Sequence, residues 1–423
     1  MVPVKYLIMS FFYVVLLNLN YIFIKTSGFY LYLGDWFDFE FSFFSLFSSV
    51  VFGFFTLYLF LKKISGIYIT LFSAVILLGV VPAIVIYSYS SDASKYYFYL
   101  SYVFFLFLFS FFLRRKVSLS KCHGSCEDLK IDIRFFRLIG LIGLILFVYF
   151  LLKNISHLNF SSLDDVYVQR AISRELVVGF EKYLYLFMKY GAGYSFVFLA
   201  FYFKSYLYFI TFSVIFFFDY LLGAHKFSLF VIILMFIFFI SVKYKSLLKI
   251  KVEYLFFSLS FYFLLTLSVF MHLVKDIYIP YVIAIYDRLY FVLAGIFARN
   301  YDYVQSNGLF YGGSSKIGTI AGAEPVDVYY AIGAYYWTDG VMANTDIISD
   351  AFVNFGALGV FVTLLIFWAL FNKVDDKFFY QNRYVFIPVV TIYSISAVYS
   401  LGLSIALLSG GLIYLIFYLN FRR

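Results

Sequence analysis

The chain has 423 residues, of which 64% are hydrophobic and only 13% are charged, and its formal net charge is +9. Soluble globular domains carry about 25% charged residues and about half apolar ones, so this composition excludes a water-soluble protein and indicates an integral membrane protein. Basic loops beside anionic lipid account for the positive charge, and no nucleic-acid partner is expected.

Twelve stretches along the chain are long and apolar enough to cross a bilayer, which takes about 20 residues of helix for about 30 Å of hydrocarbon. The first is too long for a cleavable signal and has no small-residue cleavage site after it, so we expect it to remain as a helix. We therefore expect an all-α polytopic membrane protein with about 12 transmembrane helices, forming one membrane domain over residues 1–423. The expected spans are 3–24, 38–61, 66–88, 96–113, 137–153, 183–203, 206–222, 226–242, 252–273, 351–371, 384–401 and 403–421.

The distribution of basic residues predicts the orientation of these spans. If the N-terminus is cytoplasmic, twenty of the 32 Lys and Arg residues fall in cytoplasmic segments. Because Lys and Arg are retained on that side during insertion, both termini are expected to be cytoplasmic. This leaves two large outer loops, at about 154–182 and 274–350, and any chemistry is expected to face outward.

The first outer loop carries two arginines on an expected helix from about 163 to 178, which begins at a capping box made by Ser162 and Asp165. Arg170 and Arg174 are then neighbours on one helix face, and no acidic residue stands three or four positions from either on that helix. An anion could lie between them. The alternative, in which both side chains reach solvent or lipid headgroups, is left open.

The second outer loop begins with a helix for which Pro280 suits the first turn. Arg288 and Arg299 are eleven residues apart, close to three turns, so on one helix they would share a face about 16 Å apart along the axis. One could hold a pyrophosphate while the other orients a different part of a large ligand. The alternative is a salt bridge of Arg288 with Asp287 or Asp302.

Glycine and aromatic residues are frequent in the rest of this loop, and the aromatic residues of the loop include Tyr301 and Trp337. Aromatic faces pack against the apolar faces of sugars, so a carbohydrate site is one interpretation. A belt of aromatic residues at the membrane interface is the other.

A polar group stands between the expected spans 206–222 and 226–242. Asp219 lies in an apolar run, where acids are costly and usually paired, and Lys226 is its expected partner. His225 could accept a proton at the outer surface, since histidine titrates near neutrality. No metal site is expected, because Cys122, His123 and Cys126 fall short of the four ligands of a structural zinc site.

Two segments resemble a known family. The family is that of the Wzy-type polymerases of O-antigen or capsule repeat units, which are related to O-antigen ligases. Gly223-Ala224-His225-Lys226-Phe227-Ser228 is similar to the glycine-small-basic turn of these proteins. The segment from Asn344 to Gly359 is similar to the segment that ends their large outer loop and enters the next helix. The ligases usually carry a histidine near the position of Asn344, and its absence favours a polymerase. The arginine-ten-residues-glycine pattern of some polymerases is not reproduced.

The resemblance implies a GT-C-like fold and a metal-independent glycosyltransferase, without a cofactor, in the bacterial inner membrane. Its reaction would move the growing glycan from undecaprenyl diphosphate to a sugar hydroxyl of the next lipid-linked repeat unit, on the periplasmic face, in lipopolysaccharide or other polysaccharide biosynthesis. A chain-length regulator and a flippase of the same pathway are the implied partners. Cations would stabilise the diphosphate leaving group, and a base would take the hydroxyl proton. The candidate catalytic residues are Arg288, Arg299, Asp346, Asp350 and His225, and the candidate substrate-binding residues are Arg170, Arg174, Lys226, Tyr301, Asn344 and Trp337.

Three other functions remain as alternatives. A flippase or other transporter of lipid-linked oligosaccharide would place charge along a central cavity and often has two related halves, whereas this chain concentrates charge in outer loops. An O-antigen ligase is the second alternative. A multi-pass acyltransferase is the third, and it would need a histidine-centred pair that His157, His225 and His272 do not evidently provide.

Overall fold

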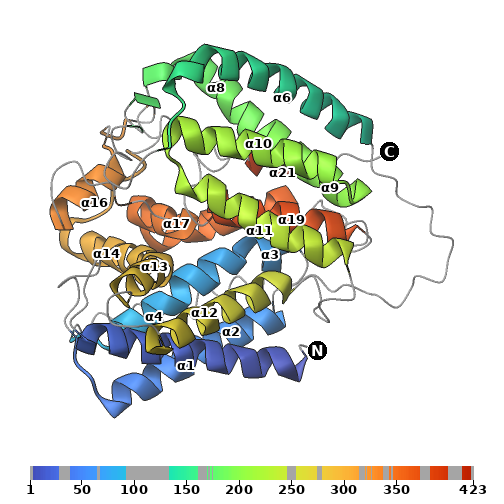
Figure 1. Cartoon of the computed structure of the whole chain (residues 1–423). Coiled ribbons are helices and arrows are strands. Elements are labelled where there is room, and N and C mark those ends of the chain that lie inside the picture. Colours follow the sequence, from blue (N-terminus) through green and yellow to red (C-terminus); the bar gives the residue numbers. More distant parts are fainter. Residues whose placement is uncertain are drawn as a thin grey trace. The chain divides into compact units, whose positions relative to one another are not determined.

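The computed structural model of the chain is built from helices. It describes residues 3–27, 39–63, 67–91, 133–160, 169, 172–173, 175–244, 254–273, 279–313, 320, 322–324, 326–336, 343, 346–371, 382–398 and 412–420. Every regular element among these residues is a helix (Figure 1). The chain forms two compact units: unit 1 comprises Met1–Val117, Glu253–Asn372 and Ser394–Ser404, and unit 2 comprises Ser118–Val252, Lys373–Tyr393 and Ile405–Arg423.

Seven helices of the described part are long and apolar enough to cross a membrane, so the protein is a multi-pass membrane protein. They span Val4–Ser27, Phe43–Lys62, Ile67–Ser88, Ile133–His157, Phe180–Phe203, Tyr206–Gly223 and Ile347–Phe371. Each coincides with one of the twelve expected spans, and the all-α prediction is confirmed.

Three more expected spans correspond to shorter apolar helices: α11 (Lys226–Lys243), α12 (Leu255–Leu273) and α19 (Arg383–Tyr393) with η6 (Ser394–Val398). The expected span 96–113 lies outside the described residues. Only α21 (Leu412–Asn420) is described within the span 403–421. The number twelve and the orientation therefore stay predictions.

Unit 1 is organised around a buried and mainly apolar helix formed by α3 (Ile67–Ala74), η1 (Val75–Val80) and α4 (Val81–Ser88). A helix that is hydrophobic on all sides belongs in a protein interior, and most of this one is covered. α1 (Val4–Ser27) packs against α2 (Phe43–Lys63), α4 and α12 (Figure 1). The unit also holds three helices that are not among the membrane-spanning ones, α13 (Ile279–Tyr290), α14 (Val292–Asn307) and α16 (Val328–Tyr336).

The last long helix of unit 1, α17 (Ile347–Phe371), is broken at Gly356, whose φ of 62° and ψ of −149° are open mainly to glycine. A break frees backbone carbonyls that a continuous helix would pair. Two of them accept hydrogen bonds from the preceding loop, Val353 from the Phe310 N–H at 3.1 Å and Asn354 from the Tyr311 N–H at 2.9 Å. The loop thus holds the two parts of α17 at the break.

Wide π-helical turns interrupt three of the buried helices, at η1, η4 (Phe187–Ala192) and η6. Such turns displace backbone groups from the regular α-helical pattern. Tyrosine hydroxyls donate to carbonyls in two of them, Tyr13 to Leu77 at 2.7 Å and Tyr393 to Tyr190 at 3.2 Å. Each bond lies within one unit and satisfies a carbonyl that has no water to bind in the interior.

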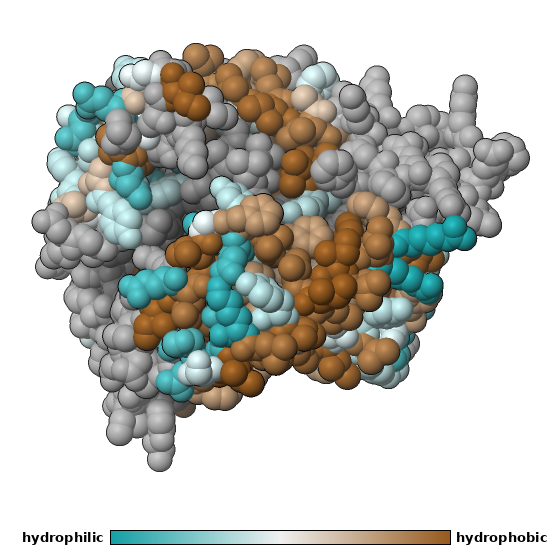
Figure 2. Space-filling model, turned by 90° about the horizontal axis from the view of Figure 1, so that it is seen from above, coloured by the Kyte–Doolittle hydropathy of each residue, from teal (hydrophilic) through white to brown (hydrophobic). Residues whose placement is uncertain are grey.

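Unit 2 combines α6 (Ile133–Asn154), α8 (Phe180–Leu186), η4, α9 (Gly193–Phe203), α10 (Tyr206–Gly223), α11, α19 and α21. α6 packs on η4 and α9, where Phe136 stacks on Phe198 with ring centroids 3.7 Å apart. The opposite face of α6 exposes Leu138, Leu141, Ile145 and Leu152. Figure 2, which looks onto the α6 side of Figure 1, shows hydrophobic residues over large areas of that face. We interpret this face as lipid-exposed.

Gly143 permits the closest approach of α6 to η4. A Cβ at this position would lie 1.9 Å from the Cβ of Ala192, whereas one at Gly140 would lie 3.1 Å from a ring atom of Phe196. We expect Gly143→Ala to lower the free energy of unfolding by about 1–3 kcal/mol through overpacking. Gly140→Ala is the matched control, because both changes bring the same gain in helix propensity of about 1 kcal/mol. Thermal unfolding in detergent measures both, and equal stability of the two variants would contradict this packing.

Candidate functional site

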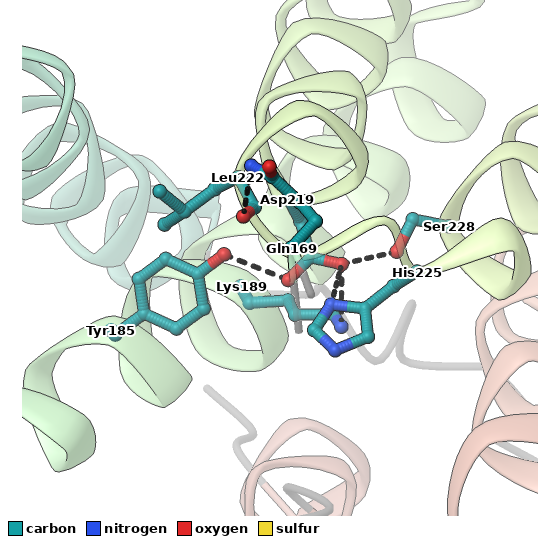
Figure 3. Close-up of polar contacts among 7 residues, drawn as sticks. All are labelled: Gln169, Tyr185, Lys189, Asp219, Leu222, His225 and Ser228. Carbon is teal, nitrogen blue, oxygen red and sulfur yellow. Dashed lines mark hydrogen bonds and ion pairs between the residues drawn. The ribbon is translucent and has the colours of Figure 1, made fainter. Parts of the chain in front are cut away.

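A polar cluster lies in the interior of unit 2, built by Asp219 on α10 and four side chains around it. We name these five residues, Tyr185, Lys189, Asp219, His225 and Ser228, the Asp219 cluster (Figure 3). They come from the α8–η4 helix, from α10 and from the start of α11, so three helices converge on one carboxylate. Tyr185 and Ser228 are far apart in the sequence, because α9 (Gly193–Phe203) and α10 (Tyr206–Gly223) lie between them.

The carboxylate of Asp219 is almost completely buried and is saturated with donors. Tyr185 Oη donates to Oδ1 at 2.8 Å, and Lys189 Nζ donates to Oδ2 at 2.9 Å, forming a salt bridge that is itself buried. Ser228 Oγ also donates to Oδ2. His225 Nδ1 lies 3.4 Å from the same oxygen (Figure 3). A charged group at this depth is stable only because it is paired and hydrogen-bonded.

The turn between α10 and α11 positions His225. α10 ends at Gly223, Ala224 takes the left-handed conformation with φ 50° and ψ 33°, and α11 begins directly after His225. The Ser228 N–H donates to the carbonyl of His225 at 2.8 Å. Such a short connection fixes where the imidazole can lie.

Gln169, from the expected first outer loop, closes the end of α10. Its Nε2 lies 3.2 Å from the carbonyl of Leu221, 3.0 Å from that of Leu222 and 2.9 Å from that of His157. The last carbonyls of a helix have no partner within it, and the amide supplies one. This residue carried no signal in the sequence that distinguished it from other loop glutamines.

His225 joins the buried cluster to the surface of the chain. Its side chain is 43% exposed, yet Nδ1 itself is buried against Asp219. The exposure therefore belongs to the rest of the side chain, which includes Nε2, and Figure 3 shows that second ring nitrogen turned away from Asp219. A Cβ on Gly223 would lie 2.5 Å from Cε1 of this ring, so the imidazole packs directly against the glycine and leaves no room for a side chain there.

The structure pairs Asp219 with a residue that the sequence did not indicate. Lys226 is the partner expected for Asp219, but its side chain lies outside the described residues, and the salt bridge is made by Lys189 from a different helix. A residue 30 positions away cannot be paired by helical spacing alone. The cost of an isolated intramembrane acid nevertheless indicates from the sequence alone that Asp219 has a partner.

A second polar group lies in unit 1 around Arg299 of α14. Its guanidinium lies 4.7 Å from the ring centroid of Tyr336 and 4.0 Å from the carboxylate of Asp302. Tyr87 Oη donates to the other oxygen of Asp302 at 2.8 Å. Burial and the nearby Asp302 carboxylate raise the pKa of Tyr336 above its usual range, so its phenol stays neutral. A partly exposed cation beside an aromatic face and an acid suits a polar ligand with phosphate or sugar groups.

The helix that was expected to join Arg288 and Arg299 is two helices. α13 ends at Tyr290 and α14 begins at Val292. Phe291 between them has φ −114° but stays in the right-handed helical region, and its N–H donates to the Asp287 carbonyl at 2.8 Å while its carbonyl accepts from the Gly295 N–H at 2.6 Å. The shared face of the two arginines stays a prediction. Arg288 lies on α13, and its side chain is outside the described residues. α14 stops at Asn307, before Gly308 with φ 86°.

The start of α17 holds two of the candidate proton acceptors. Asp346 caps the helix: its Oδ1 accepts from the N–H groups of Ile348 at 2.7 Å and Ser349 at 3.0 Å. Asp350 Oδ1 accepts from Tyr329 Oη at 3.3 Å and lies 3.4 Å from Asn354 Nδ2. Both carboxylates are buried and bonded to their own surroundings.

α14 packs against this end of α17. Tyr301, a candidate substrate-binding residue, is buried and stacks on Phe352 with ring centroids 5.4 Å apart. The fold of unit 1 thus joins two segments that the sequence separates by about fifty residues. The candidates Arg170, Arg174, Asn344 and Trp337 lie outside the described residues.

Asp346 makes the stability of the start of α17 depend on pH. Burial raises its pKa to about 6, against hydrogen bonds from Ser349 and Ile348 that lower it. A pKa raised by folding contributes stability that is fully present below about pH 4 and is lost as the pH rises through about 6, here by about 3 kcal/mol. Asp346→Asn keeps a capping oxygen without the charge. We expect this variant to be more stable than the wild type at pH 8 and similar at pH 4, as measured by thermal unfolding. Parallel pH profiles for the two proteins would contradict the prediction.

No family model, curated protein or solved structure matches the chain. Within the described residues, no group of three or more His, Cys, Asp or Glu side chains could hold a metal ion.

Proposed function

We propose that this protein is a metal-independent glycosyltransferase that polymerises lipid-linked oligosaccharide repeat units. It transfers the growing glycan from undecaprenyl diphosphate to a sugar hydroxyl of the next lipid-linked unit, on the outer face of a bacterial inner membrane. In this proposal the chain crosses the membrane about twelve times with both termini in the cytoplasm. A tag on the C-terminus that is protected from reagents added outside the cell supports this orientation, and a labelled tag overturns it.

The half-exposed imidazole of His225 is the single observation that carries the proposal. It lies in the short turn that resembles the family's motif, at one end of two apolar helices, and its buried side faces the Asp219 carboxylate. Glycosyl transfer to a hydroxyl needs a group that accepts a proton, and histidine does so near neutral pH. Asp346 and Asp350 are less suited, because their carboxylates are buried and bonded within unit 1.

The leaving group of this reaction is a lipid diphosphate, whose negative charge increases as the glycosidic bond breaks. Arg288 and Arg299 are the residues proposed to stabilise it, because a guanidinium binds phosphate oxygens through two parallel hydrogen bonds. The partial exposure of the Arg299 side chain and the aromatic face of Tyr336 beside it support a ligand-binding role.

A transporter of the same lipid-linked sugars is the second candidate, and one observation favours it. The Lys189–Asp219 salt bridge lies inside apolar helices, where ionisable pairs often mark substrate or proton pathways.

Deletion of the gene followed by glycan analysis separates the candidates. A polymerase deletion leaves single repeat units as products of the pathway and abolishes long chains. A transporter deletion traps repeat units on the cytoplasmic side, and a ligase deletion leaves polymer that is not attached to its final acceptor. Either of the last two results overturns the proposal. Purified full-length protein that extends lipid-linked repeat units extracted from the deletion strain would support it directly.

A further inference from the structure

We propose that Asp219 is a positioning residue for His225: it holds the proton of the neutral imidazole on Nδ1, so that Nε2 presents its lone pair to the acceptor sugar hydroxyl. The inference deepens the proposed function and rests on it for the identity of the hydroxyl. The orientation of the ring rests only on the contacts of the Asp219 cluster.

The position of the His225 ring beside Asp219 indicates which nitrogen carries the proton. Nδ1 is buried and 3.4 Å from Asp219 Oδ2, while the side chain as a whole is 43% exposed. A carboxylate can only accept from a neutral imidazole, so the tautomer with hydrogen on Nδ1 is favoured and the exposed Nε2 is left as the acceptor. At this distance and angle Nδ1 makes no hydrogen bond among the described residues, so the proposed role requires the contact to shorten when substrate binds, as catalytic hydrogen bonds often do.

The packing of Gly223 against the His225 ring supports the same orientation. Gly223 lies under the imidazole so closely that a Cβ there would be 2.5 Å from Cε1 and 2.7 Å from Nδ1. The left-handed Ala224 and the bond from the Ser228 N–H to the His225 carbonyl hold the turn. A methyl group at position 223 would therefore displace the ring without changing any charge.

The remaining members of the cluster keep Asp219 in the form that this role needs. Lys189 supplies a buried positive charge, and the hydroxyls of Tyr185 and Ser228 donate to the two carboxylate oxygens. All of these contacts favour an ionised carboxylate.

The chemical step balances as follows. Nε2 of His225 takes the hydroxyl proton, the hydroxyl oxygen forms a bond to the anomeric carbon of the donor glycan, and the bond from that carbon to the diphosphate breaks. The diphosphate leaves with the electron pair, and the imidazolium faces Asp219 until its proton passes to solvent. No oxidant, metal or other co-reactant is needed.

The test combines a kinetic and a spectroscopic measurement on the full-length protein in lipid nanodiscs. Asp219→Asn/Lys189→Met removes both charges of the buried pair together, which preserves charge balance and so the fold. We expect kcat for repeat-unit extension to fall on the order of 10²-fold, with KM changed less than threefold, because the wrong tautomer becomes populated. Gly223→Ala should have a similar effect on kcat, and His157→Ala, at an exposed histidine of the same unit, should have none.

Nitrogen-15 spectra of labelled histidine report the tautomer without any need for glycan transfer. In the wild type at alkaline pH we expect His225 to carry its proton on Nδ1, and in the double variant we expect the two tautomers to mix. His225→Ala identifies the signal, and added imidazole should restore part of its activity. Unchanged kcat in a folded double variant, or an unchanged tautomer, would overturn the positioning role. A wild-type protein that never extends repeat units overturns the proposed function instead, while the tautomer result still decides the role of Asp219.

Discussion

Lys189→Met is expected to lower the free energy of unfolding by about 3–5 kcal/mol, because it leaves the carboxylate of Asp219 buried without its cation. Lys189 and Asp219 are 8% and 1% exposed, so water cannot replace the lost partner. The remaining donors, Tyr185 and Ser228, are neutral. The variant should therefore accumulate poorly in the membrane, and its thermal unfolding in detergent should begin well below that of the wild type.

Two controls make this prediction specific to the buried pair. Asp219→Asn/Lys189→Met removes both charges and should recover most of the lost stability. Lys153→Met breaks the surface salt bridge with Glu181, in which the lysine is 37% exposed, and should cost no more than about 1 kcal/mol. If Lys189→Met unfolds at the same temperature as Lys153→Met, the pair contributes little and the argument for its structural role fails.

Arg299→Ala is expected to reduce the rate of glycan transfer by about 10²–10³-fold while the protein remains in the membrane, because a positioned cation at the leaving diphosphate contributes that much to the barrier. Its contacts with Asp302 and Tyr336 are partly exposed, so their loss should affect stability by about 1 kcal/mol or less. The initial rate with extracted lipid-linked repeat units and the chain-length distribution in cells measure the effect.

Conservative and matched changes test the role of the guanidinium itself. Arg299→Lys should recover only part of the rate, since an ammonium cannot form two parallel hydrogen bonds to phosphate. Arg383→Ala removes another arginine that lies against a tyrosine ring, that of Tyr384 at 5.2 Å, and should leave chain length unchanged. Arg288→Ala is expected to yield only single repeat units on the lipid carrier. Normal long chains in the Arg299 or Arg288 variant would remove that residue from the proposal.

The helices could be predicted from the sequence to a large extent, because hydropathy and helix length are local properties. α10 was expected at 206–222 and is found at Tyr206–Gly223, and its end is marked by the glycine itself. Its partner α11 follows with the same agreement. In a membrane, backbone groups must be paired within each helix, so a long apolar stretch has few alternatives to a helix.

The partners of the polar side chains could not be predicted in the same way. The position of Asp219 within an apolar stretch predicts that it has a partner. Its salt bridge to Lys189, however, depends on how α10 packs against the α8–η4 helix, and the apolar residues around Asp219 in the sequence do not indicate that packing. The division between α13 and α14 at Phe291 could not be predicted either, since Tyr290 and Phe291 fit an amphipathic helix equally well and both are buried. Aromatic residues make up 25% of the chain, which weakens any periodic pattern.

The break in α17 also separates two different surroundings along one helix. The part before Gly356 carries Asp350 and Asn354, whose polar side chains are buried inside the protein and so avoid lipid tails. The described part after Gly356 exposes Leu358, Val362 and Trp368, which are residue types that suit contact with lipid. The glycine therefore marks the point where this helix changes from a polar, protein-enclosed segment to an apolar one with a lipid-facing side.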